Sequence, residues 1–223
     1  MPRSKRAKVI ALTQTEKKTR QDKSDYVQLV REKIEEHNSI YVFSYDNMRS
    51  NKFKNVRMDF KSDDSRLFLG KNKLLQLALG RSPEEEFRDN LRHVAKHISG
   101  SVGLLITSRN EDEVKKYFGS LREEEYARAG NIATRDVIIT SEQVSHHPVG
   151  QVELFRNIGL PVDIDNGRLV LIGGKQEHTV CKEGDELSVE DCKLLTHFGV
   201  KLAEFQLTLV CKWNDTGSFE EYQ

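Results

Sequence analysis

The chain has 223 residues, 37% of them hydrophobic and 31% charged, and its 35 Lys and Arg are balanced by 35 Asp and Glu. This length suits one large domain or two small ones. No apolar run approaches the ~20 residues of a membrane helix, and the basic start has no long apolar stretch behind it, so we expect neither a membrane segment nor a secretory signal. Cys181, Cys192 and Cys211 lie far apart without a CxxC pair, which predicts reduced thiols and no structural zinc.

The net charge of zero hides a polarity along the chain. Residues 1–23 carry eight Lys or Arg and two acids, residues 24–122 carry eighteen against fifteen, and residues 123–223 carry nine against eighteen. The three segments therefore have net charges of +6, +3 and −9. Such an asymmetry is expected if only one end faces a polyanion, but an uneven surface that is merely solvated would give the same numbers.

Residues 1–22 are predicted to be a basic arm that is flexible when the chain is alone, because large apolar residues are scarce there. Its basic clusters are compatible with both a nuclear localisation signal and contacts with phosphate, and they lie at Arg3–Lys8 and Lys17–Lys23. A helical pattern begins at Asp25. The next elements expected are a buried strand, an amphipathic basic stretch, a short strand and a helix: Ile40–Phe43, Met48–Phe60, Leu67–Leu69 and Lys71–Leu79.

A Ser cap, a Pro at the first position and acids in the first turn predict a helix that starts at Ser82 and reaches Ile98. Further along, Asn166-Gly167 between two apolar runs is the signal of a tight hairpin. The other strands and helices expected in this part of the chain are Val102–Thr107, Asn110–Leu121, Val137–Ile139, Val152–Ile158, Ser188–Phe198 and Leu202–Trp213.

The alternation of strands and helices predicts an α/β fold, a layered domain with a mixed sheet that is interrupted by an inserted small α/β subdomain. The last predicted strand, Leu202–Trp213, has apolar residues at alternate positions and needs a sheet to join. We expect it to return to the first domain. That domain would comprise residues 23–124 and 200–214, with the inserted subdomain at 125–199 and a short tail at 215–223.

The sequence offers little for catalysis. No serine lies in a GxSxG elbow, and no cysteine lies in a catalytic signature. His146-His147 lacks a third ligand nearby and is predicted to be a loop, while Glu84–Glu86 and Glu123–Glu125 are predicted to be solvated helix starts. Gly173-Gly174-Lys175 and Gly70-Lys71 lack the Walker spacing. We therefore expect a protein that is not an enzyme and holds no metal or cofactor.

Nucleic-acid binding is better supported, because residues 44–81 carry nine Lys or Arg against four acids. Gly70 to Lys73 joins a strand to a helix, where free N–H groups and the helix dipole attract phosphate. The glycine permits a close approach, Lys71 and Lys73 add charge, and Asn72 can bond a sugar hydroxyl or a phosphate oxygen. The alternative is that Gly70 only makes a turn and that the lysines point to water.

Several stretches together match a known family across nearly the whole chain. They are FSYDNMRSNKFKNVRMDFK, FLGKNKLLQLALGR, PRSKRAKVIALTQTEKKTR, PEEEFRDNLRHVAKHISGSVGLLIT, ARAGNIAT and HTVCKEGDELSVEDCKLLTHFGVKLAEFQLTLVCKW. The sequence resembles the L-ten/P-zero family of ribosomal stalk-base proteins and, within it, the ribosome-assembly paralogues of the mRNA turnover protein 4 family. The GKNK segment is typical of the whole superfamily, whereas the N-terminal arm and the AEFQLTLVCKW ending are more specific for the paralogues.

The resemblance implies an α/β RNA-binding domain with an inserted subdomain, and a role on the precursor of the large ribosomal subunit, the pre-60S particle. The paralogue holds the stalk-base site of the large-subunit rRNA in the nucleus and nucleolus, beside neighbouring ribosomal proteins, and passage to the cytoplasm on pre-60S particles fits that role. The mature stalk protein replaces it, and a dual-specificity-phosphatase-like release factor acts in the exchange. The rRNA-binding residues implied are Arg49, Lys52, Lys54, Arg57, Gly70, Lys71, Asn72 and Lys73, with Lys5, Arg6 and Lys8 of the arm as a second set.

Two alternatives stay open at this point. The chain ends ten residues after Trp213 and so does not supply the helices and acidic tail with which the mature stalk protein recruits partners. We expect a placeholder for the rRNA site, and the rival is a mature stalk-base protein in truncated form. A rival from a different class, an RNA-processing enzyme, would need a metal or acid/base cluster, which the sequence does not show.

Overall fold

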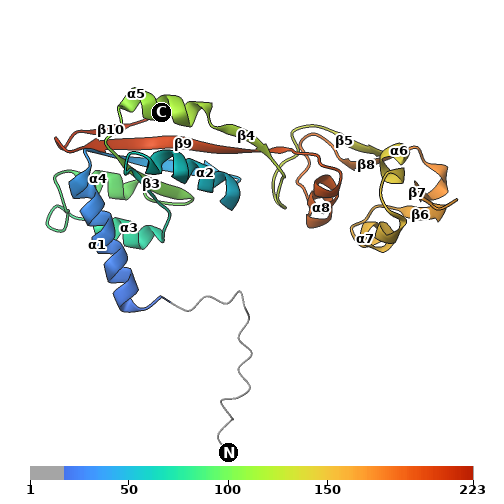
Figure 1. Ribbon diagram of the computed structural model, residues 1–223, viewed down its shortest axis with the longest axis horizontal. Helices are drawn as coiled ribbons and strands as arrows, with labels where there is room; N and C mark the ends of the chain where they lie inside the picture. Colours follow the sequence, from blue (N-terminus) through green and yellow to red (C-terminus); the bar gives the residue numbers. More distant parts are fainter. Residues whose placement is uncertain (1–17, 223) are drawn as a thin grey trace, which may run out of the picture.

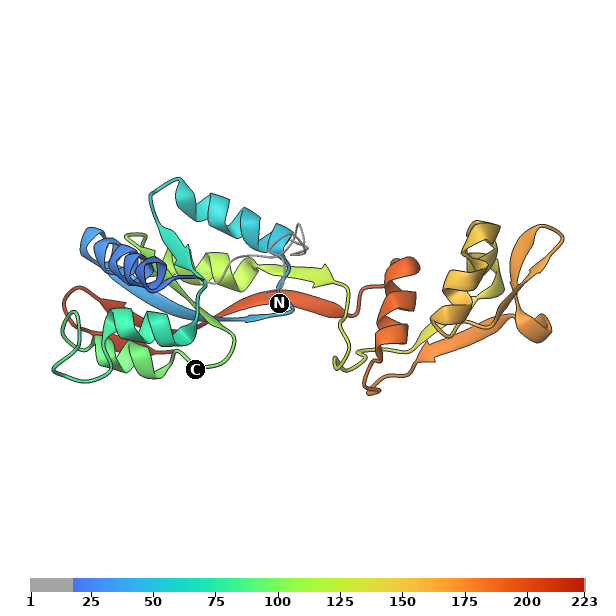
Figure 2. The ribbon, with the colours of Figure 1, turned by 90° about the horizontal axis from the view of Figure 1, so that it is seen from below.

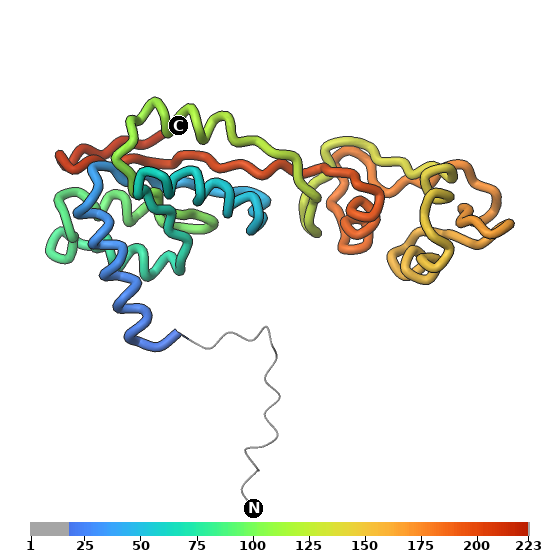
Figure 3. The backbone as a smooth tube through the Cα atoms, in the orientation of Figure 1, coloured from blue at the N-terminus to red at the C-terminus, as the bar shows by residue number. Residues whose placement is uncertain are grey.

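The computed structural model describes residues 18–222. They form two lobes joined by a narrow connection (Figure 1 and Figure 3). Strand β4 (Arg122–Glu125) leads out of the first lobe and strand β9 (Ala203–Asn214) leads back into it. The two strands pair with each other in antiparallel fashion. The second lobe is therefore inserted into the first domain, which confirms the α/β fold with an inserted subdomain.

The first lobe is built on a six-stranded sheet with the order β10-β9-β1-β3-β2, in which β4 also pairs with β9. The bounds of its other strands are Ser39–Asp46 for β1, Arg66–Phe68 for β2, Val102–Thr107 for β3 and Phe219–Glu221 for β10. All six residues of β3 and four consecutive residues of β1 are buried. Strands that are apolar along their length belong at the centre of a sheet covered on both faces.

The expected mixture of parallel and antiparallel pairs is wrong for this sheet, because each of the five pairings among its described strands is antiparallel. Strands β1 and β2 do point the same way, as strands joined by a helical crossover do. However, β3 lies between them and pairs with both in the opposite direction. The alternation of strands and helices indicates that a helix connects β1 to β2. It does not reveal which strand of the sheet lies between these two strands.

Helices cover both faces of the sheet (Figure 1 and Figure 2). Alternate residues of a strand point to opposite faces, so Ile40 and Val42 of β1 join one core and Tyr41 and Phe43 join the other. The first core packs under α1, α3 and α4, and the second packs under α2 and α5. The bounds of these helices are Arg20–Glu36, Asn72–Leu79 and Leu91–Lys96, and Ser50–Lys61 and Glu111–Ser120, respectively.

A bulge in β9 places its apolar residues on both faces of the sheet. The sequence pattern puts Phe205, Leu207, Leu209 and Cys211 on one face, but Val42 pairs with Cys211 while Phe43 pairs with Leu209. One extra residue in β9 therefore reverses the alternation, as bulges do. Cys211 lies in the first core, and Phe205 and Leu207 lie in the second. The long strand consequently ties both cores together.

Two predicted helix starts are wrong. Helix α1 begins at Arg20 rather than at Asp25, because Thr19 and Asp22 form a capping box that the apolar periodicity does not reveal. The segment that begins at Ser82 makes only turns, and its helix, α4, begins at Leu91. The Glu86 N–H does bond the Ser82 carbonyl, but Asn90 adopts a left-handed φ of 67° directly before Leu91, which separates this turn from the helix.

The inserted lobe contains two small antiparallel sheets, β5–β8 and β6–β7, and the helices α6, α7 and α8. The Asn166-Gly167 hairpin is confirmed, since both residues have positive φ angles of 47° and 74° between β6 and β7. The bounds in this lobe are Val137–Thr140 for β5, Ser141–Ser145 for α6, Val152–Asn157 for α7, Val162–Asp165 for β6, Arg168–Leu171 for β7, Glu177–Cys181 for β8 and Val189–His197 for α8. Within residues 18–222, no helix has the length and apolar character required to cross a membrane.

We predict that the cores of the two lobes unfold separately. The single tryptophan, Trp213, is fully buried in the first core, so its fluorescence reports on the first lobe. Leu79→Ala opens a cavity in the same core and is expected to lower the free energy of unfolding by about 2–5 kcal/mol in urea titrations. Phe155→Ala, in the core of the inserted lobe, should leave this transition unchanged within ~0.5 kcal/mol. Equal shifts for both variants would contradict separate unfolding.

Candidate nucleic-acid interface

The segment Gly70 to Lys73 lies at the strand-to-helix turn that the sequence predicts. It follows β2, with Lys71 as the N-cap of α3 and Asn72 as its first residue. Lys71 and Lys73 are exposed and have no ion-pair partner among residues 18–222. The side chain of Asn72 instead donates its amide to the Gly100 carbonyl at 2.9 Å, so it fixes the start of α3 to the turn before β3. Its carbonyl oxygen and its second amide N–H stay available to a ligand.

Gly70 packs against the side chain of Tyr26 of α1. A Cβ built on Gly70 would lie 2.9 Å from Cζ of Tyr26 and closer still to the hydroxyl oxygen. Any side chain at this position therefore displaces the tyrosine. This contact does not test the prediction that Gly70 admits an RNA phosphate, which stays a prediction. Because of the contact with Tyr26, a substitution such as Gly70→Asp would disturb α1 as well as any bound RNA.

Helix α2 presents an exposed basic stripe. Lys54 and Arg57 are exposed, and the Arg57 guanidinium lies 4.8 Å from the centre of the Phe53 ring, a cation–π contact that leaves its N–H groups free for a ligand. Lys61, one turn further along, and Arg66 at the start of β2 are also exposed and lack ion-pair partners within the described part of the chain. The sequence prediction counted both in the basic region but did not assign them to the site. Helical spacing from Lys54 and Arg57 is the signal that would have included Lys61.

Arg49 and Lys52 are engaged inside the fold instead. The ammonium of Lys52 donates to the Glu124 carbonyl at 2.8 Å and lies 3.0 Å from Glu123 Oε2. Arg49 donates from Nη2 to the Tyr126 carbonyl at 3.0 Å. Both cations thus hold the end of β4 against the start of α2. The sequence groups them with their basic neighbours because the acids they meet come about 70 residues later.

The prediction for the run Glu123–Glu125 is wrong, because it forms strand β4 and not a solvated helix start. Glu125 is buried, 8% exposed, beside both Arg49 and Lys52. Burial by itself raises the pKa of this carboxyl, but the Tyr126 N–H and the two cations outweigh it and hold the pKa below its usual value. Glu125 is therefore charged at neutral pH, and it anchors the connection between the lobes.

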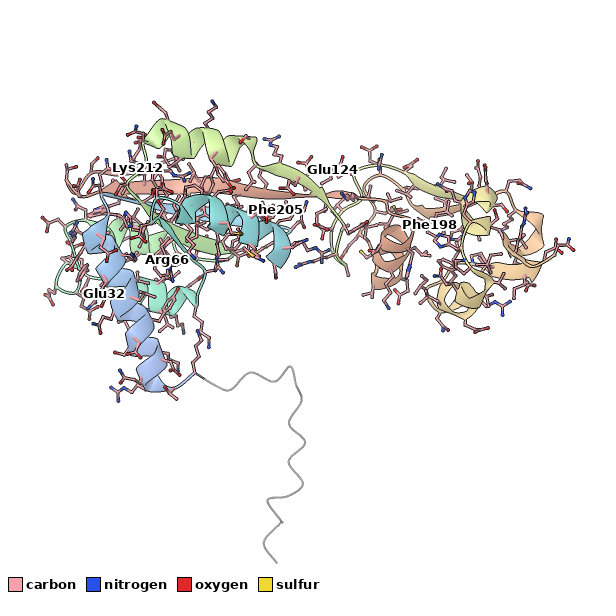
Figure 4. All side chains as sticks on the ribbon, viewed as in Figure 1. Glu32, Arg66, Glu124, Phe198, Phe205 and Lys212 are labelled. Carbon is pink, nitrogen blue, oxygen red and sulfur yellow. The ribbon has the colours of Figure 1, made fainter. Side chains whose placement is uncertain are left out.

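A cleft opens between α1, α2 and β2, beside Gly70. It has a volume of about 350 Å³, and its lining includes Tyr26, Arg57, Lys61, Arg66 and Leu67. Arg66, labelled in Figure 4, lies between α1 and α2. Arg57 and Lys61 of α2 and Arg66 of β2 thus border one concave surface. Lys5, Arg6 and Lys8 lie outside the described residues.

One group of described side chains has the spacing of a metal site, Glu36, His37 and Asp64. The ammonium of Lys33 already bonds both carboxylates, and the two ring nitrogens of His37 bond Ser108 Oγ at 3.0 Å and the Asp64 carbonyl at 3.1 Å. The Lys33 ammonium is thus the cation that the carboxylates of Glu36 and Asp64 bind in this structure, without a metal ion. The pair His146-His147 follows α6, and the His147 ring packs 5.0 Å from that of Phe155.

Comparison with known proteins decides the family. The profile described as ribosomal protein L10 matches residues 18–122, and the profile of the insertion domain found in 60S ribosomal proteins of this family matches residues 127–200. The ribosome assembly factor mrt4 of Neurospora crassa is 39% identical, and the alignment covers 96% of this chain and 90% of that protein. The chain belongs to the Mrt4 branch of the ribosomal protein L10 family. The resemblance seen in the sequence is thereby confirmed.

Two proteins of Saccharomyces cerevisiae separate the branches of this family. Its ribosome assembly factor MRT4 is 30% identical over 99% of this chain and 97% of its own length. Its large ribosomal subunit protein uL10 is 26% identical over 86% of this chain, but only 59% of uL10 is covered. The higher identity and the fuller coverage of the assembly factor favour that branch over uL10. The names of these relatives describe assembly factors and ribosomal proteins.

We predict that two lysines two residues apart differ in their contribution to stability. Lys52→Ala removes one of the cations beside the buried carboxylate of Glu125 and should lower the free energy of unfolding by about 1–3 kcal/mol. Lys54→Ala removes an exposed side chain without a described partner and should change it by less than ~0.5 kcal/mol. Urea titrations followed by far-UV circular dichroism measure both values. Similar losses in the two variants would contradict the structural role of Lys52.

Proposed function

We propose that this protein is a non-catalytic ribosome-assembly factor that binds large-subunit rRNA at the stalk base of the pre-60S particle. The observation that carries the proposal is the set of exposed cations without described partners around the turn before α3, in a chain of the L10 family. Lys54, Arg57, Lys71 and Lys73 contact the RNA backbone, and Gly70 lets it approach the turn. Membership of the L10 family implies association with the ribosome, and the basic surface supplies the chemistry for it.

The role proposed for the remaining predicted residues follows from their contacts. Arg49 and Lys52 position α2 against β4. Because their side chains are held in this contact, their charges attract the RNA from a distance and do not bond it directly. Asn72 fixes the start of α3 and offers its carbonyl oxygen. Lys5, Arg6 and Lys8 of the N-terminal arm add phosphate contacts. The lobe at 125–199, interrupting the rRNA-binding domain of residues 23–124 and 200–214, faces away from the RNA because the chain from residue 123 onward is acidic.

The protein holds the stalk-base site until the mature stalk protein takes it. This exchange takes place on pre-60S particles that leave the nucleolus and nucleus, with a dual-specificity-phosphatase-like release factor as a partner. The support is the similarity to assembly factors over nearly the full chain and the weaker similarity to uL10 over a shared region. Two proteins that share an rRNA-binding domain compete for one site. No catalytic step is needed for such a role.

RNA affinity should depend strongly on salt. If about five phosphates are neutralised, log K falls against log salt with a slope of roughly −3.5 to −4.5. Lys71→Glu with Lys73→Glu should weaken binding to a stalk-base rRNA fragment and reduce the magnitude of the slope by roughly 1 per lysine. The matched control is Lys175→Glu with Lys182→Glu, which changes the net charge equally on exposed positions of the inserted lobe. Equal losses in both pairs would refute the proposed face.

Exclusive use of the site predicts competition. This protein and uL10 of the same organism should displace each other from one stalk-base rRNA fragment, because both carry the L10 domain. Native mass spectrometry of mixtures at saturating concentrations measures the composition of the complexes. A ternary complex of both proteins on one fragment would exclude the placeholder role while leaving RNA binding itself intact.

A further inference from the structure

The cleft between α1, α2 and β2 combines three features that the contacts with RNA phosphates do not explain. Its floor is apolar, with Leu67 and Phe68 buried in β2. The ring of Tyr26 forms one wall and meets Phe68 edge to face, with the ring centres 6.0 Å apart. At about 350 Å³, the cleft lies at the small end of the range of ligand pockets, ~300–1,000 Å³.

Cations surround this apolar floor. Arg57 and Lys61 come from α2, and Arg66 comes from the start of β2. None of the three has an ion-pair partner among residues 18–222, although Arg109 and Lys33 nearby are both paired with carboxylates of the turn after α2. An apolar cavity bordered by unpaired cations fits a ligand with a flat apolar body and an anionic attachment. A nucleotide has this composition, with its base as the body and its phosphates as the attachment.

The hydroxyl of Tyr26 is the second, independent observation. Its oxygen is buried against Gly70 and has no hydrogen-bond partner in the described structure. A buried hydroxyl without a partner costs about 1–3 kcal/mol, so phenylalanine would serve the packing better. Because Tyr26 also lines the cleft, a rotation of its side chain would bring the hydroxyl towards a ligand bound there.

The geometry points to a binding site for one unpaired nucleotide of the RNA in this cleft, with the base on the apolar floor beside Tyr26 and its phosphates at Arg57, Lys61 and Arg66. This inference rests on the proposed RNA-binding function and extends it from the phosphate backbone to a single base. Paired bases are stacked inside the helix, whereas bases in loops and bulges can turn out and stack on aromatic side chains. The site therefore selects RNA that carries an unpaired nucleotide at a fixed distance from the segment bound at Lys71 and Lys73.

The test uses the full-length protein and a stalk-base fragment of large-subunit rRNA, prepared intact and as a series with one abasic site at each unpaired position. With the unsubstituted protein, an abasic site at one position of the series should weaken binding roughly 5- to 100-fold, as loss of a stacked base does. Tyr26→Phe should weaken binding of the intact RNA about 3- to 10-fold without loss of stability. Tyr41→Phe is the matched control, since the Tyr41 hydroxyl is likewise buried without a hydrogen-bond partner in the described structure but does not line the cleft.

Arg66→Ala provides a second variant that does not depend on the packing of Tyr26, because Arg66 is exposed. At the sensitive abasic position, Tyr26→Phe should cause little further loss, since the base beside Tyr26 is absent. Arg66→Ala should still weaken binding there, since the phosphates at Arg66 remain. If the intact protein does not bind the fragment at all, the proposed function itself fails. If it binds, but no abasic site weakens it and Tyr26→Phe behaves like Tyr41→Phe, the nucleotide site alone is refuted.

Discussion

The pairing of β9 with β1 holds the first domain together and sets the path of the whole chain. The two strands are adjacent at eight positions, from Ser39 opposite Asn214 to Asp46 opposite Gln206. Through its bulge, β9 contributes to the cores on both faces of the sheet, and it also pairs with β4. A chain that leaves by β4 and returns by β9 must carry the inserted lobe outside the sheet. The same pairing therefore completes the first domain and extends the second lobe away from it (Figure 1).

The basic residues of the first domain fall into two groups with different physical roles. Arg49 and Lys52 bond to the chain of β4, where they keep Glu125 charged and hold the connection between the lobes. Lys54, Arg57 and their exposed neighbours have no such partners in the described structure, and their charges remain available to a polyanion. A count of lysines and arginines cannot separate these groups, because net charge records composition and not contacts. The distinction gives the proposed rRNA-binding face its boundary at the start of α2.

Helix α1 links the two parts of that face. Tyr26 contacts Gly70 at the turn before α3 and also lines the cleft beside α2. The glycine that the sequence associates with phosphate approach is thus also fixed by an aromatic ring from a helix more than forty residues earlier. A phosphate at the turn and a base in the cleft would thus lie near the same side chain, Tyr26. Backbone contacts of this kind fix position, and an inserted base adds selectivity.

Elements with local signals could be predicted from the sequence alone. The Asn166-Gly167 hairpin, the strand Val102–Thr107 and the turn at Gly70 follow from backbone preferences and short-range periodicity, and the family follows from matching stretches along the chain. The false helix start at Ser82 shows the limit of such signals, because a favourable cap was followed by a left-handed Asn90. The position of β3 between β1 and β2, and the contact of Lys52 with the acids of β4, emerge only from the three-dimensional fold. These pairings join residues far apart in the chain, and their free energy depends on a packed geometry that no local pattern records.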